Sequence, residues 1–195
     1  MIKSLKARES ELAMVAKQIE IISAIDNQPR FADKLRNIGL FPLKPTSVEI
    51  LQINIGYMCN QTCEHCHVDA GPDRKEVMTK QTMQYCLGAI DNSEVKTVDI
   101  TGGAPEMNPH FVWFIEQLSM RDIHIIIRSN LTILVANKKY HSYPDLFKKH
   151  NVEVIASLPC YTKENTDKQR GDGVFAASIS ALKMLNSVGY GMHAT

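Results

Sequence analysis

The sequence has no excess of charge of one sign and no long apolar run. Lysine and arginine number 22 and aspartate and glutamate 21, so the net charge is +1. This balance gives no electrostatic reason to expect a nucleic acid or a membrane surface as partner. The segment 1–27 is charged and lacks the cleavage pattern of a secretory signal, and nothing in the chain is apolar enough to span a bilayer. We therefore expect a soluble, cytoplasmic protein.

Cysteine is scarce, and aromatic residues make up only 7% of the 195 residues. The five cysteines are odd in number, which without a secretion signal favours free or metal-bound thiols over disulfide bonds. A hydrophobic content of 44% is still enough for one sizeable core. The lysine pairs at 138–139 and 148–149 indicate solvated faces.

Three of the cysteines form the most specific motif in the chain. Cys59, Cys63 and Cys66 follow an apolar segment, with three residues and then two between them. Soft thiolates suit iron–sulfur clusters, and three of them bind three irons of a [4Fe–4S] cube. The fourth iron keeps an open coordination site, which is the property that distinguishes a reactive metal centre from a structural one. The spacing thus predicts a reactive cluster.

A structural zinc site is the main alternative interpretation of this loop. Cys59, Cys63, Cys66 and the adjacent His67 supply the four ligands of a closed Cys3His site. Zinc motifs usually pair ligands from two separate knuckles, whereas here all four come from one short loop. The spacing therefore favours the cluster.

The chain divides into an N-terminal segment, 1–45, and a core, 46–195. Leu5, Leu12, Val15, Ile19 and Ile22 have helical spacing, and the residues 26–29 predict the end of that helix. We expect residues 31–45, with two prolines, to be an irregular connector.

Strand and helix patterns then alternate along the core. Strands are predicted at 48–55, 95–100, 123–128 and 152–158, the first with an apolar run typical of strands buried on both faces. Helices are predicted after a cap at Thr79, after Asn108-Pro109, near 144–149 and over 174–188 with Gly189 as its stop. The fold class is α/β: a parallel sheet of about four βα units, forming part of a barrel.

Every candidate site segment follows the end of a predicted strand. The cysteine loop leaves the first strand, 101–106 leaves the second, 128–130 closes the third and 157–160 closes the fourth. Reactive groups in such folds gather at the carboxyl ends of the strands. We therefore expect these segments to meet at one rim of the sheet, whereas Cys86 lies on the core face of its helix.

With the Cys59–Cys66 loop after the first strand and Gly102-Gly103 after the second, the chain resembles the radical S-adenosylmethionine superfamily. The resemblance implies a TIM-barrel-like fold with a [4Fe–4S] cluster and S-adenosyl-L-methionine as cofactors. The methionyl amine and carboxylate chelate the open iron, and reduction of the sulfonium releases methionine and a 5′-deoxyadenosyl radical. It also implies an electron donor such as a flavodoxin or ferredoxin.

The resemblance carries over to individual residues. His65 takes the place of a residue near adenine, Gly102 and Gly103 match the turn that receives the methionyl ammonium, and Arg170 matches a partner of the methionyl carboxylate. Asn130 and Ser157 match positions that contact the ribose or methionyl portion. Where the superfamily has an acidic residue directly after the glycines, this chain has Ala104, then Pro105 and Glu106. His67 and Asp69 follow the loop closely and are candidates for tuning the cluster, the alternative being ordinary loop residues.

Longer strings resemble a narrower family, the arsenosugar-biosynthesis radical S-adenosylmethionine proteins. The similar strings are 60–72, 99–106, 130–134 and 157–161, within a resemblance that covers about residues 31–195. It implies a small-molecule substrate, a trivalent methylated arsenical that receives the 5′-deoxyadenosyl group. Because trivalent arsenic is thiophilic, Cys160 is a candidate substrate ligand. The alternative within the same class is a radical enzyme acting on a peptide or another metabolite.

Members of that family continue beyond this length. The residues 190–195 look like the opening of a fifth strand, and a sheet ending there would leave an unpaired edge. We therefore expect a truncated product. Two further alternatives are an inactive remnant and a half-barrel completed by a partner chain.

Overall fold

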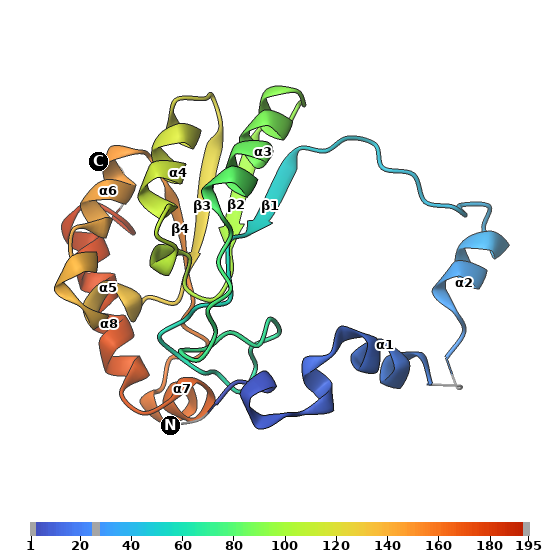
Figure 1. Ribbon diagram of the computed structural model, residues 1–195, viewed down its shortest axis with the longest axis horizontal. Helices are drawn as coiled ribbons and strands as arrows, with labels where there is room; N and C mark the ends of the chain where they lie inside the picture. The colour runs from blue at the N-terminus through green and yellow to red at the C-terminus, as the bar shows by residue number, and fades with distance from the viewer. Residues whose placement is uncertain (1–2, 25–27, 193–195) are drawn as a thin grey trace.

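The computed structural model describes residues 3–24 and 28–192 and contains one parallel sheet (Figure 1). Its strands are hydrogen-bonded in sequence order, β1-β2-β3-β4. Their bounds are β1 Ile50–Asn54, β2 Thr97–Thr101, β3 His124–Ser129 and β4 Glu153–Ala156. The sheet is not closed on itself, so the predicted α/β fold with a partial barrel is confirmed.

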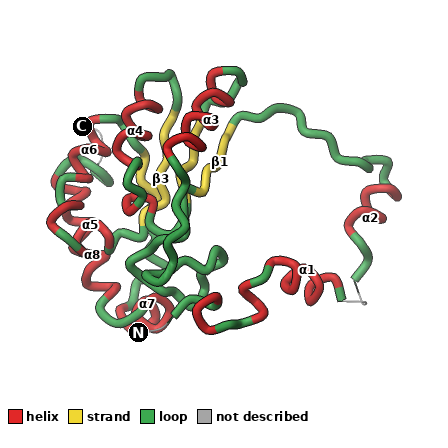
Figure 2. Tube along the Cα trace, in the orientation of Figure 1, coloured by secondary structure: helices red, strands yellow, loops and turns green. Residues whose placement is uncertain are grey.

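Helices alternate with the strands and cover one face of the sheet (Figure 2). No helix among the described residues is long and apolar enough to cross a membrane. The helical elements that follow β1 are α3 Lys80–Asp91, η3 Pro105–Met107, α4 Phe111–Ser119, α5 Ile133–Ala136, η4 Lys138–Tyr140, α6 Tyr143–Lys149, α7 Lys163–Arg170 and α8 Val174–Ser187.

The core lies between the sheet and these helices. Alternate residues of β2 and β3 point toward the helices, and Ile100 and Ile127 are fully buried there. Phe111 of α4 stacks on Tyr143 and meets the edge of Phe147, with ring centroids 5.8 Å and 6.2 Å away. This apolar layer fixes the helices against the sheet and thereby fixes the strand ends.

The opposite face of the sheet carries polar groups. Gln52 Nε2 donates to Asp99 Oδ2 over 2.8 Å, and Arg128 Nη2 donates to the same oxygen over 2.8 Å. These contacts connect β1, β2 and β3. None of the helices in the described ranges covers this face, so the prediction of a first strand buried on both faces is wrong: β1 is an edge strand, and its Ile50 is 60% exposed.

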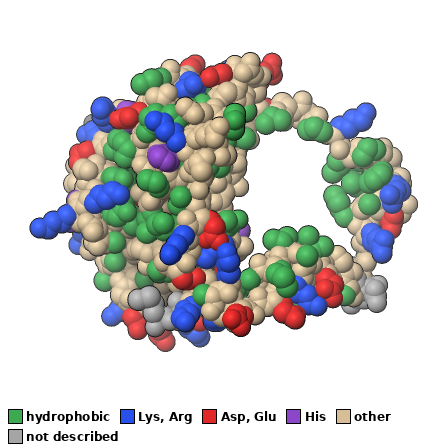
Figure 3. Space-filling model, viewed as in Figure 1, with side chains coloured by type: hydrophobic (Ala, Val, Ile, Leu, Met, Phe, Trp, Pro, Cys, Tyr) green, Lys and Arg blue, Asp and Glu red, His purple; other side chains and the backbone are tan. Residues whose placement is uncertain are grey.

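The N-terminal segment differs from the single helix that the sequence predicts. It contains two 3-10 turns, η1 Lys6–Arg8 and η2 Glu11–Ala13, and then α1 Val15–Ser23. Part of its predicted stop, 26–29, lies outside the described residues. The predicted connector holds a further helix, α2 Phe31–Asn37. Both helices lie away from the sheet, and Figure 3 shows hydrophobic side chains gathered on them.

Other helix boundaries follow local hydrogen bonds. Thr79 caps α3 as predicted, because its Oγ1 accepts from the Thr82 N–H over 3.2 Å. The helix predicted after Asn108-Pro109 starts only at Phe111, because Asn108 Oδ1 accepts from the His110 N–H in a preceding turn. Helix α7 was not predicted, since its sequence has no apolar periodicity. The expected fifth strand is absent from the described residues 190–192, and 193–195 lie outside them.

Replacing Phe111 with alanine tests the core. The side chain is fully buried between two aromatic rings, so we expect a loss of about 3–5 kcal/mol in the free energy of unfolding. Urea denaturation measures it. Met120, which is 75% exposed, is the matched control, and its replacement with alanine should change stability by less than about 0.5 kcal/mol. Equal losses in the two variants would contradict this packing.

Candidate functional site

The cysteine loop is fixed by backbone hydrogen bonds within the loop and to the turn that follows β2. Inside the loop, the Cys59 N–H donates to the Gly71 carbonyl over 3.2 Å. From the turn after β2, the Gly103 N–H donates to the Gly56 carbonyl over 2.9 Å and the Ala104 N–H to the Met58 carbonyl over 2.8 Å. The entrance of the loop is therefore attached to the Gly-Gly turn by main-chain groups.

The two glycines are needed for this attachment. A Cβ on Gly102 would lie 2.6 Å from the Gly56 carbonyl oxygen, and one on Gly103 would lie 2.5 Å from the Met58 carbonyl oxygen. Gly102 also has φ +147°, a conformation that side chains disfavour. The resemblance to the superfamily implies that a cofactor approaches these glycines closely. The described contacts give them an additional role, which is close approach of the loop itself.

All the cofactor and metal residues expected from the sequence line one cavity of about 230 Å³, here called the rim cavity. It lies at the carboxyl ends of the strands, as the fold predicts. Its lining includes Cys59, Cys63, His65, Cys66, Gly102, Gly103, Asn130, Ser157 and Arg170.

Two of the three sulfurs accept hydrogen bonds. Cys59 Sγ accepts from Asn130 Nδ2 and from the Gln61 N–H, each over 3.4 Å. Cys66 Sγ accepts from the Ala70 N–H over 3.3 Å. Donors directed at sulfur are what a thiolate metal ligand requires. The donors at Cys59 and Cys66 would therefore stabilise these sulfurs as thiolates.

Burial acts on the free thiols in the opposite direction. Desolvation raises the pKa of Cys59 to about 11, against the opposing effect of its two hydrogen-bond donors. Desolvation also raises the pKa of Cys63, while the nearby Arg170 guanidinium opposes that shift. Metal binding here therefore has to displace protons from the thiols.

Arg170 is the last residue of α7 and contacts Gln61 of the cysteine loop, which lies 109 residues earlier in the sequence. Its Nη2 donates to Gln61 Oε1 over 2.9 Å, and its Nη1 donates to the Ser157 carbonyl. Only the Nε of this buried guanidinium lacks a partner within the described residues. Each Nη group carries two N–H bonds and uses one of them in these contacts, so donors remain for the bidentate carboxylate contact that the resemblance implies, which stays a prediction.

Gln61 and Arg128 also line the rim cavity, although sequence reasoning gave neither of them a role of its own. Gln61 lies between the cysteines, and its buried Nε2 has no partner within the described part of the chain. Arg128 projects from β3 with its side chain 45% exposed, paired with the buried Asp99. Polar residues alternate with apolar ones in β2 and β3, and this pattern could have indicated that Asp99 and Arg128 lie on the same face of the sheet.

Other candidates lie elsewhere. Cys160 is not among the residues that line the rim cavity; its sulfur lies 3.5 Å from Thr162 Oγ1, and that contact lowers the pKa of its thiol. Glu106 is fully buried away from the cavity. Asp69 accepts from the backbone N–H groups of Leu5 and Lys6 and so anchors the N-terminal segment to the cysteine loop.

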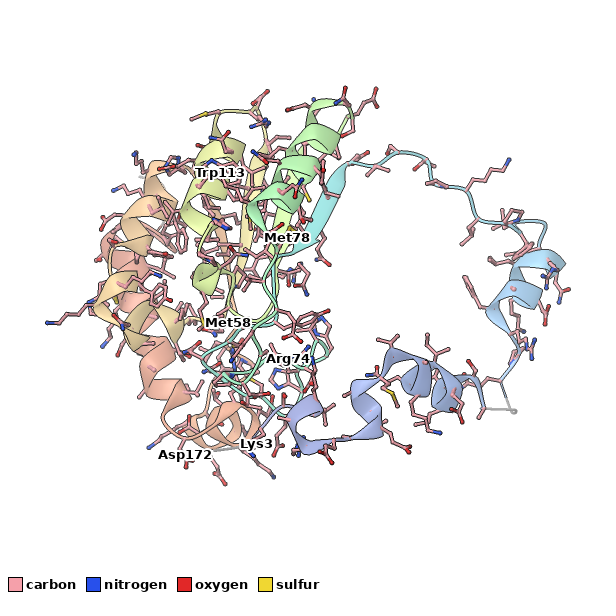
Figure 4. The ribbon with its side chains drawn as sticks, viewed as in Figure 1. Lys3, Met58, Arg74, Met78, Trp113 and Asp172 are labelled. Carbon is pink, nitrogen blue, oxygen red and sulfur yellow. The ribbon has the colours of Figure 1, made fainter. Side chains whose placement is uncertain are left out.

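A larger cleft of about 1230 Å³, here called the loop cleft, shares Cys59, Gln61 and Arg170 with the rim cavity. Met58 and Arg74 on the loop and Asp172 after α7 also line it, and Figure 4 labels all three. The site therefore has room beside it for a ligand larger than the rim cavity itself.

The residues present fit an iron–sulfur cluster better than a zinc ion. Three thiols border one cavity, their sulfurs receive N–H donors, and unpartnered donors on Gln61 and Arg170 remain. Among the described residues, no group of three cysteine, histidine or acidic side chains is close enough to hold a single metal ion, as a Cys3His site would require. A cube does not need such convergence, because each thiolate binds a different iron.

A parallel βα sheet with a three-cysteine loop at its rim defines a class of cluster-binding barrel proteins. Residues 53–194 match the family model described as "Radical SAM superfamily", and the chain belongs to that family.

Curated relatives are similar over part of their length. The mycofactocin maturase MftC of Mycobacterium ulcerans is 29% identical over 135 residues, which cover 69% of this chain and 35% of the relative. A probable GTP 3′,8-cyclase of Saccharolobus islandicus is 23% identical over 145 residues, covering 73% of this chain and 45% of the relative. The chain thus spans less than half the length of these relatives.

Solved structures share the fold. Streptococcus suis SuiB bound to S-adenosylmethionine superimposes with a TM-score of 0.61 at 18% identity, covering 95% of this chain and 43% of SuiB. The anSMEcpe structure with bound AdoMet has a TM-score of 0.59 at 16% identity, covering 72% of this chain and 41% of the other.

Replacing Gly103 with alanine tests the loop attachment. The added Cβ would meet the Met58 carbonyl oxygen at 2.5 Å and the Ala70 Cβ at 2.9 Å, so we expect a loss of about 1–3 kcal/mol in stability. Thermal unfolding measures the change. The control is Gly88→Ala in α3, where a Cβ meets nothing within 4 Å and should not destabilise. A Gly103 variant as stable as the control would refute the described packing.

Glu106 predicts a pH dependence of stability. Burial raises its pKa from 4.5 to about 7, so between these values the folded chain keeps a proton that the unfolded chain releases. The contribution of this carboxyl to stability is therefore complete below pH 4.5, declines as pH rises and is lost above about 7. Urea denaturation across this range should show the stability of the natural chain falling relative to Glu106→Gln. A constant difference would contradict the burial of this carboxyl.

Proposed function

We propose that this chain is the core of a radical S-adenosylmethionine enzyme. It binds a [4Fe–4S] cluster through Cys59, Cys63 and Cys66, with S-adenosyl-L-methionine beside it. The observation that carries the proposal is the rim cavity, where three thiols from one loop meet polar groups from the ends of three further strand segments. Family membership over residues 53–194 supports it.

When bound, the two cofactors supply an electron and a sulfonium whose cleavage gives methionine and a 5′-deoxyadenosyl radical. The chain's own residues hold and orient them. The Gly102-Gly103 turn fixes the loop that carries the cysteines, while His65, Asn130, Ser157 and Arg170 border the space for the nucleoside and the amino acid. An external reductant of the flavodoxin or ferredoxin type would supply the electron.

For the substrate we retain a trivalent methylated arsenical, which receives the 5′-deoxyadenosyl group. Its support is the resemblance of four separate sequence strings to arsenosugar-biosynthesis proteins. Cys160, with its lowered thiol pKa, would be an arsenic ligand that delivers the substrate from outside the rim cavity.

A peptide substrate is the second candidate. The loop cleft of about 1230 Å³ is much larger than a small arsenical needs. SuiB has also been solved bound to the precursor peptide SuiA, with a TM-score of 0.61 to this chain. Mass spectrometry after incubating the reduced, reconstituted protein with dimethylarsinite separates the two. An adenosylated arsenical supports the first substrate; 5′-deoxyadenosine formed without any arsenical adduct favours the second.

Substituting the loop cysteines tests the cluster. After anaerobic reconstitution we expect about four irons and four sulfides per chain, with an electron paramagnetic resonance signal of the reduced cluster that changes when S-adenosylmethionine is added. Serine at Cys59, Cys63 or Cys66 should abolish both signal and iron content.

Cys86→Ser is the matched control, because Cys86 packs against the core on α3 and should leave the cluster intact. A colourless chain with one zinc, or a signal indifferent to S-adenosylmethionine, would overturn the proposed function.

A further inference from the structure

The side chain of Asn130 is directed at a metal ligand. It follows the last residue of β3 and is 5% exposed. Its Nδ2 lies 3.4 Å from Cys59 Sγ and 2.7 Å from Asn60 Oδ1. The resemblance to the superfamily assigned Asn130 to the ribose or methionyl group of the cofactor. Here its amide donor is instead used by a cysteine of the loop.

The orientation of this amide is fixed by its other contacts. Asn130 Oδ1 accepts from the Ile133 N–H over 3.0 Å and from Thr132 Oγ1 over 3.3 Å. Because a backbone N–H can only donate, the atom facing it has to be the oxygen. The NH2 group therefore faces Cys59. Asn60 closes the arrangement, since its Nδ2 donates to Thr132 Oγ1 over 2.9 Å.

A turn with unusual backbone geometry holds Asn130 in place. The next residue, Leu131, is fully buried and has φ +65°, which costs a non-glycine residue roughly 1–3 kcal/mol. Its N–H donates to Ser129 Oγ over 3.2 Å, and Ser129 Oγ donates in turn to Glu106 Oε1 over 2.6 Å. A buried carboxyl from the segment after Gly-Gly thus fixes the turn that presents Asn130 to the cysteine.

From these contacts we infer that Asn130 is a positioning residue of the cluster, which raises its reduction potential through a hydrogen bond to the Cys59 sulfur. The inference deepens the proposed function and rests on it. Reduction adds negative charge to the cluster and its thiolates, so a donor at the sulfur stabilises the reduced state more than the oxidised one. The burial of Cys59, which is 6% exposed, limits screening by solvent and so strengthens the effect.

Two substitutions at Asn130 test the inference. Asn130→Leu keeps the approximate volume and removes the donor. Asn130→Asp keeps the shape and the acceptor for the Ile133 N–H, but places a negative oxygen beside the sulfur. The control is Thr132→Val, which removes the hydroxyl that contacts Asn60 and Asn130. The Ile133 N–H still donates to Asn130 Oδ1 in this variant, so the orientation of the amide is kept. Each protein is reconstituted, assayed for iron and sulfide, and titrated with a reductant while its electron paramagnetic resonance signal is recorded.

We expect the potential to fall in the order natural chain, Asn130→Leu, Asn130→Asp. Loss of the donor should lower the ratio of reduced to oxidised cluster by about tenfold at fixed solution potential, which is about 59 mV for one electron. Thr132→Val should match the natural chain. A role for Asn130 in folding alone would change the iron content and leave the potential of the remaining clusters unaltered.

The outcomes separate this inference from the proposed function. If the natural chain takes up no cluster, the proposed function fails and the inference fails with it. If Asn130→Leu carries a full cluster with unchanged potential but binds S-adenosylmethionine more weakly, the inference is overturned while the proposed function stands. Asn130 would then belong to the cofactor subsite that the resemblance implied.

Discussion

The site depends on two main-chain hydrogen bonds between the Gly-Gly turn and the entrance of the cysteine loop. The Gly103 and Ala104 N–H groups donate to the carbonyls of Gly56 and Met58, and no Cβ fits between these backbones. Because the turn directly follows β2, its position is determined by the pairing of β2 with β1 and β3. The loop has no regular secondary structure, yet it acquires the rigidity of the sheet through these bonds.

The two faces of the sheet have separate roles. The helix-covered face is apolar and holds the strands by burial, whereas the open face carries Gln52, Asp99 and Arg128 in a hydrogen-bonded row. The aromatic contacts of Phe111 lie on the first face and the rim cavity at the strand ends. The packing of the core and the lining of the rim cavity therefore use different side chains of the same strands.

Much of this arrangement could be predicted, because strand ends converge by topology. Cysteine spacing and alternating patterns placed Cys59, Gly102, Asn130 and Ser157 at one rim, and they do line one cavity. The individual contacts could not be predicted. Arg170 contacts Gln61 across 109 residues from a helix with no apolar periodicity, and α1 has the helical spacing that the sequence shows yet buries none of its residues. Local propensity carries no information about such long-range pairings.

The first described residues lie directly against the cysteine loop. Leu5 and Lys6 donate backbone N–H groups to Asp69, a residue at φ +50°, and Ser4 is almost fully buried beside Asp73. Lys3, Ser4 and Leu5 line one cavity together with Cys63 and Cys66, so a bulky group attached at Lys3 would lie close to two of the three loop cysteines. Such a group would change the access of solvent and oxygen to the loop without altering any of its cysteines.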